Sequence, residues 1–215
     1  MPNDTGPTPM ERFIQGILPE NPVYRQLLGM CPVLAVTSKV SNAITMAAAV
    51  MFVLVCANIL VSLIRNILQP HLRILVFTLT IATFVTIADK VLAAYLYPMS
   101  KQLGPYIPLI IVNCLIICRC EVCASKQGVV TATFDAVGQS LGFLLALVSM
   151  ATVRELLAYG SWFDIELFWI AGTPQEAYRW GLMGMPPGAF FTLGVLLGVA
   201  NWITTLGKKK DKASA

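Results

Sequence analysis

The chain has 215 residues, of which 57% are hydrophobic and 12% are charged, whereas about 25% of the residues in a typical soluble domain are charged. Too few charged residues are present to cover the surface of a soluble domain of this size, so the composition predicts an integral membrane protein. The net charge of +4 does not indicate nucleic-acid binding, because the cations gather at the ends of apolar runs and in a polar tail, and no basic face interleaved with aromatic residues is left.

Six apolar stretches follow one another along the chain, and each is close to the roughly 20 residues that a membrane-spanning helix needs. The cleanest of them runs from Val40 to Ile64 without a charged residue. The predicted fold class is therefore an all-α integral membrane protein with six transmembrane helices. The predicted spans are about 22–38, 42–65, 74–97, 104–120, 128–155 and 186–206, within a membrane domain of residues 21–207.

Both ends of the chain are expected on the cytoplasmic side. An even number of spans places the two termini on one side, and that side carries most of the cations, including the lysines of the tail at 208–215. The positive-inside rule assigns this side to the cytoplasm. Residues 1–20 are predicted to be a cytoplasmic N-terminal segment with an amphipathic part at the membrane surface, since they lack the apolar core of a cleavable signal peptide.

The longest loop on the opposite side runs from Ser161 to Trp180. It carries three tryptophans, at Trp162, Trp169 and Trp180, and tryptophan is enriched where a membrane meets water. We therefore expect an interfacial hairpin or a short helix here, and nothing in the sequence indicates a binding loop.

Two short and interrupted segments resemble each other in placement and chemistry. Residues 28–32 place Cys31 between a glycine and a proline, and residues 112–114 place Cys114 after two prolines. Each segment is followed by a serine-lysine pair and then by a long apolar span that ends in arginine, at Arg65 and at Arg154. Three spans separate the matching elements, so the second half is expected upside down relative to the first. This pattern predicts two inverted three-helix repeats, with broken half-helices at the first and fourth spans and a site near the bilayer midplane.

Three interpretations of Cys31 and Cys114 follow from the residues alone. A cysteine in an apolar span commonly packs as a small hydrophobic side chain. Two facing thiols could instead form a disulfide, although the chain has no disulfide framework to suggest an oxidising compartment. Ligation of a metal or an iron-sulfur cluster is the third interpretation. Cluster iron takes about four cysteine thiolates per 2Fe-2S centre, so a partner subunit would have to supply the other half.

The same residues resemble the RnfE/NqrD family, the membrane subunits of the Rnf and sodium-pumping quinone reductase complexes. The resemblance covers about residues 15–205, and the patterns at 29–37 and 186–190 favour the Rnf branch over the quinone reductase branch. The matching motifs are Asn21-Pro22, the run Gln26 to Thr37, Ile107 to Ile110, Asn113-Cys114, Arg119, Glu121, Ala124 to Lys126, Val153 to Glu155 and Pro186 to Phe190.

The resemblance implies a six-helix protein that pairs with a homologous sister subunit, RnfA, of opposite orientation. Each subunit contributes two cysteines to one buried 2Fe-2S cluster, and on this chain those ligands would be Cys31 and Cys114. The implied function is electron transfer in an ion-translocating ferredoxin:NAD oxidoreductase with the subunits RnfB, RnfC, RnfD and RnfG. Electron transport would be coupled to sodium or proton translocation across a bacterial or archaeal cytoplasmic membrane.

The chain would be an enzyme only as a subunit of that translocase-type oxidoreductase, with no complete active site and no catalytic residue of its own. It has no GxGxxG fingerprint and no ferredoxin-type cysteine run, so we do not expect it to bind NAD alone. One alternative is the equivalent subunit of a sodium-pumping NADH:quinone reductase. Another is a small-solute transporter, because inverted repeats with broken helices are a transporter architecture.

The chain departs from the family pattern after Cys114. Where the family usually reads Gly-Arg-Ala-Glu-Ala-Phe-Ala, this chain has cysteines at Cys118, Cys120 and Cys123. At about 100° per residue, Cys114 and Cys118 share one helix face, while the other two lie on roughly the opposite face. We therefore expect no second cluster, and Cys118 is kept as an alternative ligand or a neighbour of the cluster. Arg119 and Glu121 are further candidate neighbours, which would stabilise the broken helix end or bias the reduction potential.

Two carboxylates lie inside predicted spans, where an uncompensated charge costs several kcal/mol. For Asp89 the alternatives are an ion pair, with Lys90 or with a cation of another helix, and a place on an ion pathway. For Asp135 they are a position near the membrane interface and a place on that pathway.

Overall fold

The computed structural model describes residues 10, 13, 16, 20–65, 70–95, 97–124, 127–159, 161–162, 165–166 and 181–213. Apart from one pair of two-residue strands, the regular structure in these residues is helical, which confirms the all-α part of the predicted fold class. The elements are α2 (Met30–Val36), α3 (Val40–Ile64), η1 (Pro70–Leu72), α4 (Arg73–Tyr95), α5 (Tyr97–Leu103), η2 (Gly104–Tyr106), α6 (Pro108–Ile111), α7 (Cys114–Arg119), the π-helical turn η3 (Cys120–Ala124), α8 (Val129–Tyr159), β1 (Ser161–Trp162), β2 (Ile165–Glu166), α9 (Gly181–Gly184) and α10 (Pro186–Ala213).

Three helices of the described chain are long and apolar enough to cross a membrane, namely α3, α4 and α8. A fourth candidate arises if Tyr97–Tyr106 and Pro108–Ala124, which are bent by 57° at the break between them, form one span. The three long helices match the predicted spans 42–65, 74–97 and 128–155 within four residues at each end. The predicted span 186–206 falls within α10.

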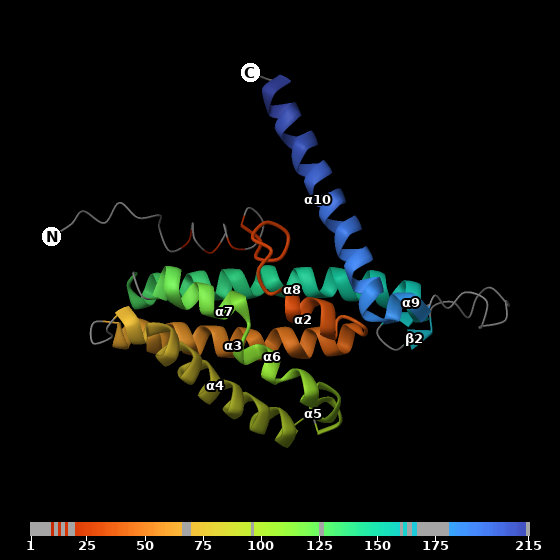
Figure 1. The fold of residues 1–215 in the computed structure, drawn as a ribbon. Helices are drawn as coiled ribbons and strands as arrows, with labels where there is room; N and C mark the ends of the chain where they lie inside the picture. The colour runs from red at the N-terminus through yellow and green to blue at the C-terminus, as the bar shows by residue number, and fades with distance from the viewer. Residues whose placement is uncertain are drawn as a thin grey trace.

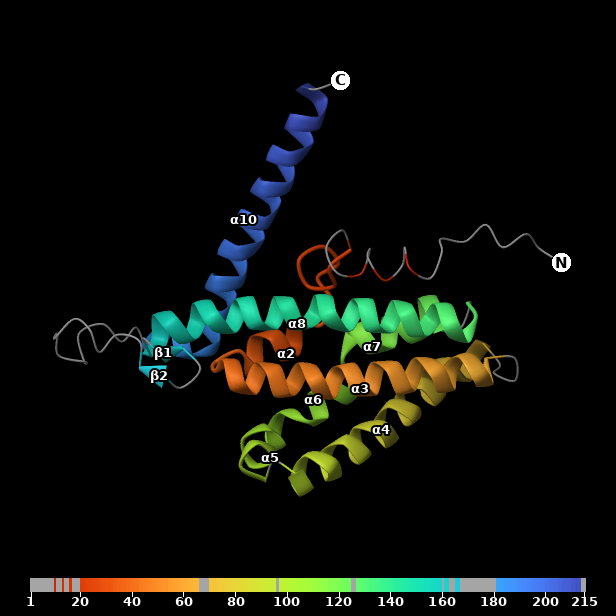
Figure 2. The ribbon, with the colours of Figure 1, turned by 180° about the vertical axis from the view of Figure 1, so that it is seen from behind.

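The centre of the molecule is an antiparallel pair of helices, α3 and α8, which lie side by side in both ribbon views (Figures 1 and 2). At one end of the pair, the backbone N–H of Val40 donates to Glu155 Oε2 at 2.7 Å. At the other end, Ser62 Oγ donates to the Gln127 carbonyl at 3.2 Å. Small buried side chains let helix backbones approach closely; the buried alanines of the two helices include Ala43, Ala47, Ala57, Ala132, Ala136 and Ala146.

The outer helices present apolar side chains to the surroundings. On α4, which lies along the side of α3 away from α8 (Figure 1), Ile74, Leu75 and Leu79 are each about two-thirds exposed. Helix α10 starts beside α8 and α9 and then leaves the body (Figure 2), and its Phe191 and Trp202 are exposed to a similar extent. A soluble protein rarely exposes continuous apolar surface of this kind, whereas hydrocarbon accepts it.

The first predicted span, 22–38, is not one continuous helix. Residues 20–29 form turns, in which the Asn21 side chain accepts hydrogen bonds from the backbone N–H groups of Val23 and Tyr24 at 3.1 and 3.2 Å. Leu27 and Gly29 adopt left-handed backbone angles, with φ of 54° and 75°. Helix α2 therefore begins only at Met30 and has seven residues, about 10 Å at the helical rise per residue.

The fourth predicted span, 104–120, is divided into η2, α6 and α7. Proline stands near the start of both η2 and α6, where its missing N–H costs nothing. Helix α6 ends after a single turn, and α7 begins at Cys114 after the extended residue Asn113. The helix breaks thus fall within both segments that the sequence marks as interrupted.

Glycines on α8 accommodate the N-terminal part of the chain. A Cβ atom placed on Gly138 would lie 2.7 Å from the Phe13 carbonyl oxygen, and one placed on Gly16 would lie 2.8 Å from the Gly138 carbonyl carbon. The Asn21 side-chain amide also donates to the carbonyl of Gly142, one turn further along α8, at 3.0 Å. Phe13, Gly16 and Asn21 therefore lie directly against the backbone of α8.

Valine at Gly138 is expected to lower the stability of the protein, because its side chain would overlap the backbone at Phe13. Overpacking of this kind costs about 1–3 kcal/mol. The measurement is the thermal unfolding midpoint of the purified protein in detergent. Gly194→Val on α10 is the matched control, since a Cβ there meets nothing within 4 Å. Equal midpoints for the two variants would contradict the contact.

Several predictions fall wholly or partly outside the described residues. In the loop 161–180, β1 and β2 pair antiparallel, with Trp162 opposite Ile165, which agrees with the expected hairpin; residues 167–180 lie outside the described part. The N-terminal segment 1–20 is described at four positions only, and the side chains of the tail 208–215 are not described.

Candidate functional site

The two cysteine segments meet inside the protein. The backbone N–H of Gly29 donates a hydrogen bond to Cys114 Sγ at 2.9 Å, across 85 residues of sequence. Cys31 follows Gly29 by two residues, so its Cα lies within about 7 Å of the Gly29 Cα. Cys31 is exposed and Cys114 is half-buried. The fold therefore brings the two cysteine segments together and leaves Cys31 at the surface.

Each cysteine stands at the start of a short helix, directly after a break. Gly29 precedes α2 in the left-handed conformation, which glycine adopts at little cost. Asn113 precedes α7 in an extended conformation, and its side chain accepts a hydrogen bond from the Leu115 N–H at 3.0 Å. This is the usual N-terminal cap of a helix. The two breaks place Cys31 and Cys114 in similar local positions.

The Phe143 ring packs against the backbone at Gly29. It comes from the middle of α8 and is 1% exposed. A Cβ atom placed on Gly29 would lie 2.8 Å from Cε2 of its ring. The same Cβ would lie 3.6 Å from the Asn113 side-chain oxygen. The backbone at Gly29 is thus confined between α8 and the segment that carries Cys114.

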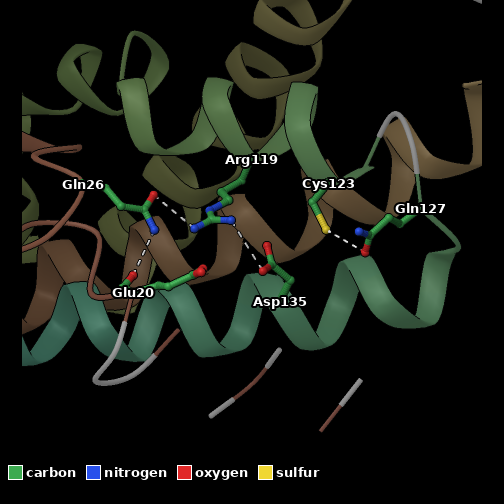
Figure 3. A network of polar contacts seen from close by, with 6 residues as sticks. All are labelled: Glu20, Gln26, Arg119, Cys123, Gln127 and Asp135. Carbon is green, nitrogen blue, oxygen red and sulfur yellow. Dashed lines mark hydrogen bonds and ion pairs between the residues drawn. The ribbon is translucent and has the colours of Figure 1, made fainter. Parts of the chain in front are cut away.

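Arg119 joins the two interrupted segments to α8 (Figure 3). Its guanidinium lies 3.6 Å from Asp135 Oδ1 and donates to Gln26 Oε1 at 3.1 Å. Gln26 in turn donates to the Glu20 carbonyl at 3.0 Å. The side chains of Arg119 and Asp135 are 6% and 2% exposed. The charge of Asp135 is therefore compensated within the protein by Arg119. Arg119 could be predicted from the sequence as a neighbour of the site, but its pairing with Asp135 could not.

Two arginines near the ends of the long helices donate hydrogen bonds to neighbouring segments. Arg154, which is 2% exposed, donates to Thr37 Oγ1 at 2.7 Å and to the Leu34 carbonyl at 3.4 Å, both at the end of α2. It also donates to the backbone carbonyls of Met183, Gly184 and Met185, at 3.2 to 3.3 Å. Arg65, at the end of α3, donates to the Gln127 carbonyl at the start of α8. The feature of the sequence that marks these two arginines is that each ends one of the two long apolar spans.

The additional cysteines after Cys114 point to different neighbours. Cys120 Sγ lies 3.4 Å from Asn58 Oδ1 on α3, and Cys123 Sγ lies 3.5 Å from Gln127 Oε1 (Figure 3). Both are buried, whereas Cys118 is half-buried. In the part of the chain that the structure describes, no three histidine, cysteine, aspartate or glutamate side chains are grouped closely enough to hold a metal ion.

The remaining charged candidates lie around α4. Glu121 Oε1 is 3.8 Å from Arg73 Nη1, in a pair whose side chains are 42% and 30% exposed, so it connects η3 to the start of α4. Asp89 is half-buried on α4. Among the described residues it makes no ion pair or side-chain hydrogen bond. The suggested pair with Lys90 is absent there, because adjacent residues of a helix do not face each other.

Comparison with known proteins places the chain in a family. A model of the Rnf-Nqr subunit, a membrane protein, matches residues 9–197. The E subunit of the Na(+)-translocating ferredoxin:NAD(+) oxidoreductase complex of Acetobacterium woodii is 43% identical over 195 residues, which are 91% of this chain and 97% of that protein. The E subunit of the ion-translocating oxidoreductase complex of Methanosarcina acetivorans is 43% identical over 196 residues, 90% of this chain and 91% of that protein. The D subunit of the Na(+)-translocating NADH-quinone reductase of Aeromonas hydrophila is 40% identical over 181 residues, 84% and 86% of the two chains. The chain therefore belongs to the Rnf-Nqr family of membrane subunits.

Proposed function

We propose that this chain is an electron-transfer subunit of an ion-translocating ferredoxin:NAD oxidoreductase of the Rnf type. In this proposal, Cys31 and Cys114 supply two of the four thiolate ligands of a 2Fe-2S cluster that is shared with the sister subunit RnfA. The observation that carries the proposal is the hydrogen bond from the Gly29 N–H to Cys114 Sγ, because it draws the two cysteine segments together.

The chemistry of the donor set fits half of such a site. Iron in these clusters takes cysteine thiolates, typically four for each 2Fe-2S centre, and the segments that carry two cysteines meet here. Cys31 is exposed, which leaves its sulfur accessible to a second subunit. When bound, the cluster would accept and pass on single electrons. The chain's own residues would hold the sulfurs through two short helices, and the buried Phe143 ring packs against the backbone at Gly29.

The membrane arrangement that we propose has six spans in two inverted repeats, with both termini in the cytoplasm. Two observations support the repeat. Helices α3 and α8, the second span of each half, lie antiparallel. Arg65 follows α3 and donates to the Gln127 carbonyl just ahead of α8, and Arg154, in the last two turns of α8, donates to the Leu34 carbonyl in the last turn of α2. In the complex, RnfB, RnfC, RnfD and RnfG would supply the ferredoxin-, NAD- and flavin-handling parts.

The function is tested in inverted membrane vesicles from cells with and without this chain. Electron transfer from reduced ferredoxin to NAD⁺ and from NADH to quinone are measured separately. Loss of the first activity alone is the expected result. Loss of the second activity alone would favour the sodium-pumping quinone reductase, whose D subunit in Aeromonas hydrophila is 40% identical to this chain. Unchanged electron transfer in both assays would favour a transporter.

We further propose that Asp89 lies on the ion pathway of the complex. It is half-buried on a helix that is apolar enough to span the membrane, and such intramembrane carboxylates commonly serve transport. Asparagine at Asp89 is expected to lower sodium or proton uptake per electron transferred, with electron transfer retained and the protein stably folded. The measurement is the ratio of ion uptake to NADH formed in the vesicles.

Asp135→Asn separates a structural role from a pathway role. Asp135 is paired with the buried Arg119, so its neutralisation leaves a buried cation less well compensated. Asp135→Asn is therefore expected to lower the unfolding temperature, which Asp89→Asn should not do. If both variants keep the wild-type ratio of ions to electrons, neither carboxylate lies on the pathway.

A further inference from the structure

The amide of Gly29 is aimed at the sulfur of Cys114 by the local backbone. The turn ahead of α2 has left-handed residues at Leu27 and Gly29, and the Leu28 N–H is held by the Pro22 carbonyl at 2.8 Å. This geometry turns the next N–H, that of Gly29, away from its own segment. It donates instead to Cys114 Sγ, 2.9 Å away, in the other interrupted segment.

A side chain at position 29 would disturb this contact for two independent reasons. A φ of 75° strains any residue that carries a Cβ. The Cβ would also lie 2.8 Å from the Phe143 ring, which is buried and has little room to move. Glycine at this position therefore preserves both the turn and the direction of its N–H.

A hydrogen bond to a ligand sulfur has a defined effect on electron transfer. Reduction adds negative charge that is shared with the ligand sulfurs, and a donor aimed at a sulfur stabilises the more negative state. Hydrogen bonds to the sulfurs are accordingly among the factors that set the potentials of iron-sulfur centres. A donor supplied by the segment of one cysteine to the sulfur of the other also fixes the two ligands relative to each other.

We propose that Gly29 is a positioning residue whose N–H donates to the Cys114 sulfur and raises the reduction potential of the cluster held there. This inference rests on the proposed function, since it requires a cluster at Cys31 and Cys114. Gly29 is not itself a ligand of the cluster, and its redox role is performed by its backbone N–H.

The first test needs no variant. The complex is produced with ¹⁵N-labelled glycine and otherwise natural nitrogen, reduced, and examined by pulsed electron paramagnetic resonance. A hyperfine coupling from a glycine nitrogen to the reduced cluster is expected. A normal cluster signal without such a coupling would overturn the inference and leave the proposed function intact. The absence of iron and of any cluster signal would contradict the proposed function itself.

The second test compares variants by redox titration of the same signal. Gly29→Ala is expected to abolish the glycine coupling, because the labelled glycine is replaced, and to shift the midpoint potential to more negative values. Phe143→Leu in the same chain removes the ring atoms that the new Cβ would meet. The double variant is therefore expected to have a midpoint potential closer to the wild-type value. Phe143→Leu alone, which keeps the glycine, is the control and should retain the wild-type potential.

The comparison can be made even if Gly29→Ala alone fails to retain iron. In that case the chain with both substitutions is compared with the chain that carries Phe143→Leu only. A wild-type potential and an unchanged glycine coupling in the iron-containing Gly29 variants would overturn the inference. A shift of the potential to more negative values in Gly29→Ala that Phe143→Leu partly reverses supports it, because the reversal ties the potential to the backbone position at residue 29.

Discussion

Serine at Cys31 or at Cys114 is expected to abolish electron transfer through the complex while the complex still assembles. In the proposed site each cysteine supplies one of the two thiolates that this chain would contribute, and a serine hydroxyl does not replace a thiolate as an iron ligand. Loss of a group that only supports a metal ligand already costs about 10–100-fold, so loss of a ligand should lower the rate by more than about 100-fold. The measurement is NAD⁺ reduction by reduced ferredoxin in membranes with equal amounts of the assembled complex.

Three other cysteines provide matched controls. Cys56 is half-buried in α3, and Cys123 is buried beside Gln127, so serine at either position should leave electron transfer near the wild-type rate. Cys118 stands one helical turn after Cys114. If Cys118→Ser stopped electron transfer and Cys114→Ser did not, the second ligand would have to be reassigned to Cys118. Activity close to the wild-type value in both Cys31→Ser and Cys114→Ser would exclude the assigned ligand pair.

Replacing Arg154 by leucine is expected to produce the largest loss of stability in the chain. Its guanidinium is almost fully buried and donates to Thr37 Oγ1 and to backbone carbonyls at the ends of α2 and α9. Without it those acceptors lose their donor, and each unsatisfied buried group costs about 1–3 kcal/mol. The expected total is about 3–5 kcal/mol, in the range observed when a buried charged network loses one partner. Thermal unfolding of the purified protein in detergent measures the effect.

Two variants sharpen this prediction. Arg73→Leu removes an arginine whose ion pair with Glu121 is long and partly exposed, and such pairs contribute at most about 1 kcal/mol. Arg154→Lys keeps the charge but not the planar fork of donors, so it should fall between the wild type and Arg154→Leu. If Arg154→Leu unfolded at the same temperature as Arg73→Leu, the network around Arg154 would not stabilise the fold.

The long helices could be predicted from the sequence because each is specified locally. The run from Val40 to Ile64 contains no charge and no proline, and it forms one helix over that whole length. The chain ahead of Met30 could not be predicted in the same way. Its turns depend on the Asn21 side chain, which also contacts the Gly142 carbonyl on α8, 121 residues away. Hydropathy counts the apolar residues of 22–38 but does not register such a contact.

In the candidate site, too, the features specified by neighbouring residues could be predicted, and the contacts between separate elements could not. The matching placement of Cys31 and Cys114 in two interrupted segments can be seen in the sequence, because the interruptions are made by local residues. The contact of the Gly29 amide with Cys114, and the pairing of Arg119 with Gln26 and Asp135, join residues of separate elements. The sequence alone therefore left the partner of Asp135 open, although it had identified Arg119 as a neighbour of the second cysteine.

The most direct measurement is the iron content and the low-temperature electron paramagnetic resonance spectrum of this chain purified together with its sister subunit alone. We predict about two iron atoms per pair, as one 2Fe-2S centre requires, and the signal of such a centre after reduction. Both should be retained in Cys56→Ser and lost in Cys31→Ser. An iron-free wild-type pair, or a Cys31→Ser pair with the full iron content and an unchanged signal, would contradict the account.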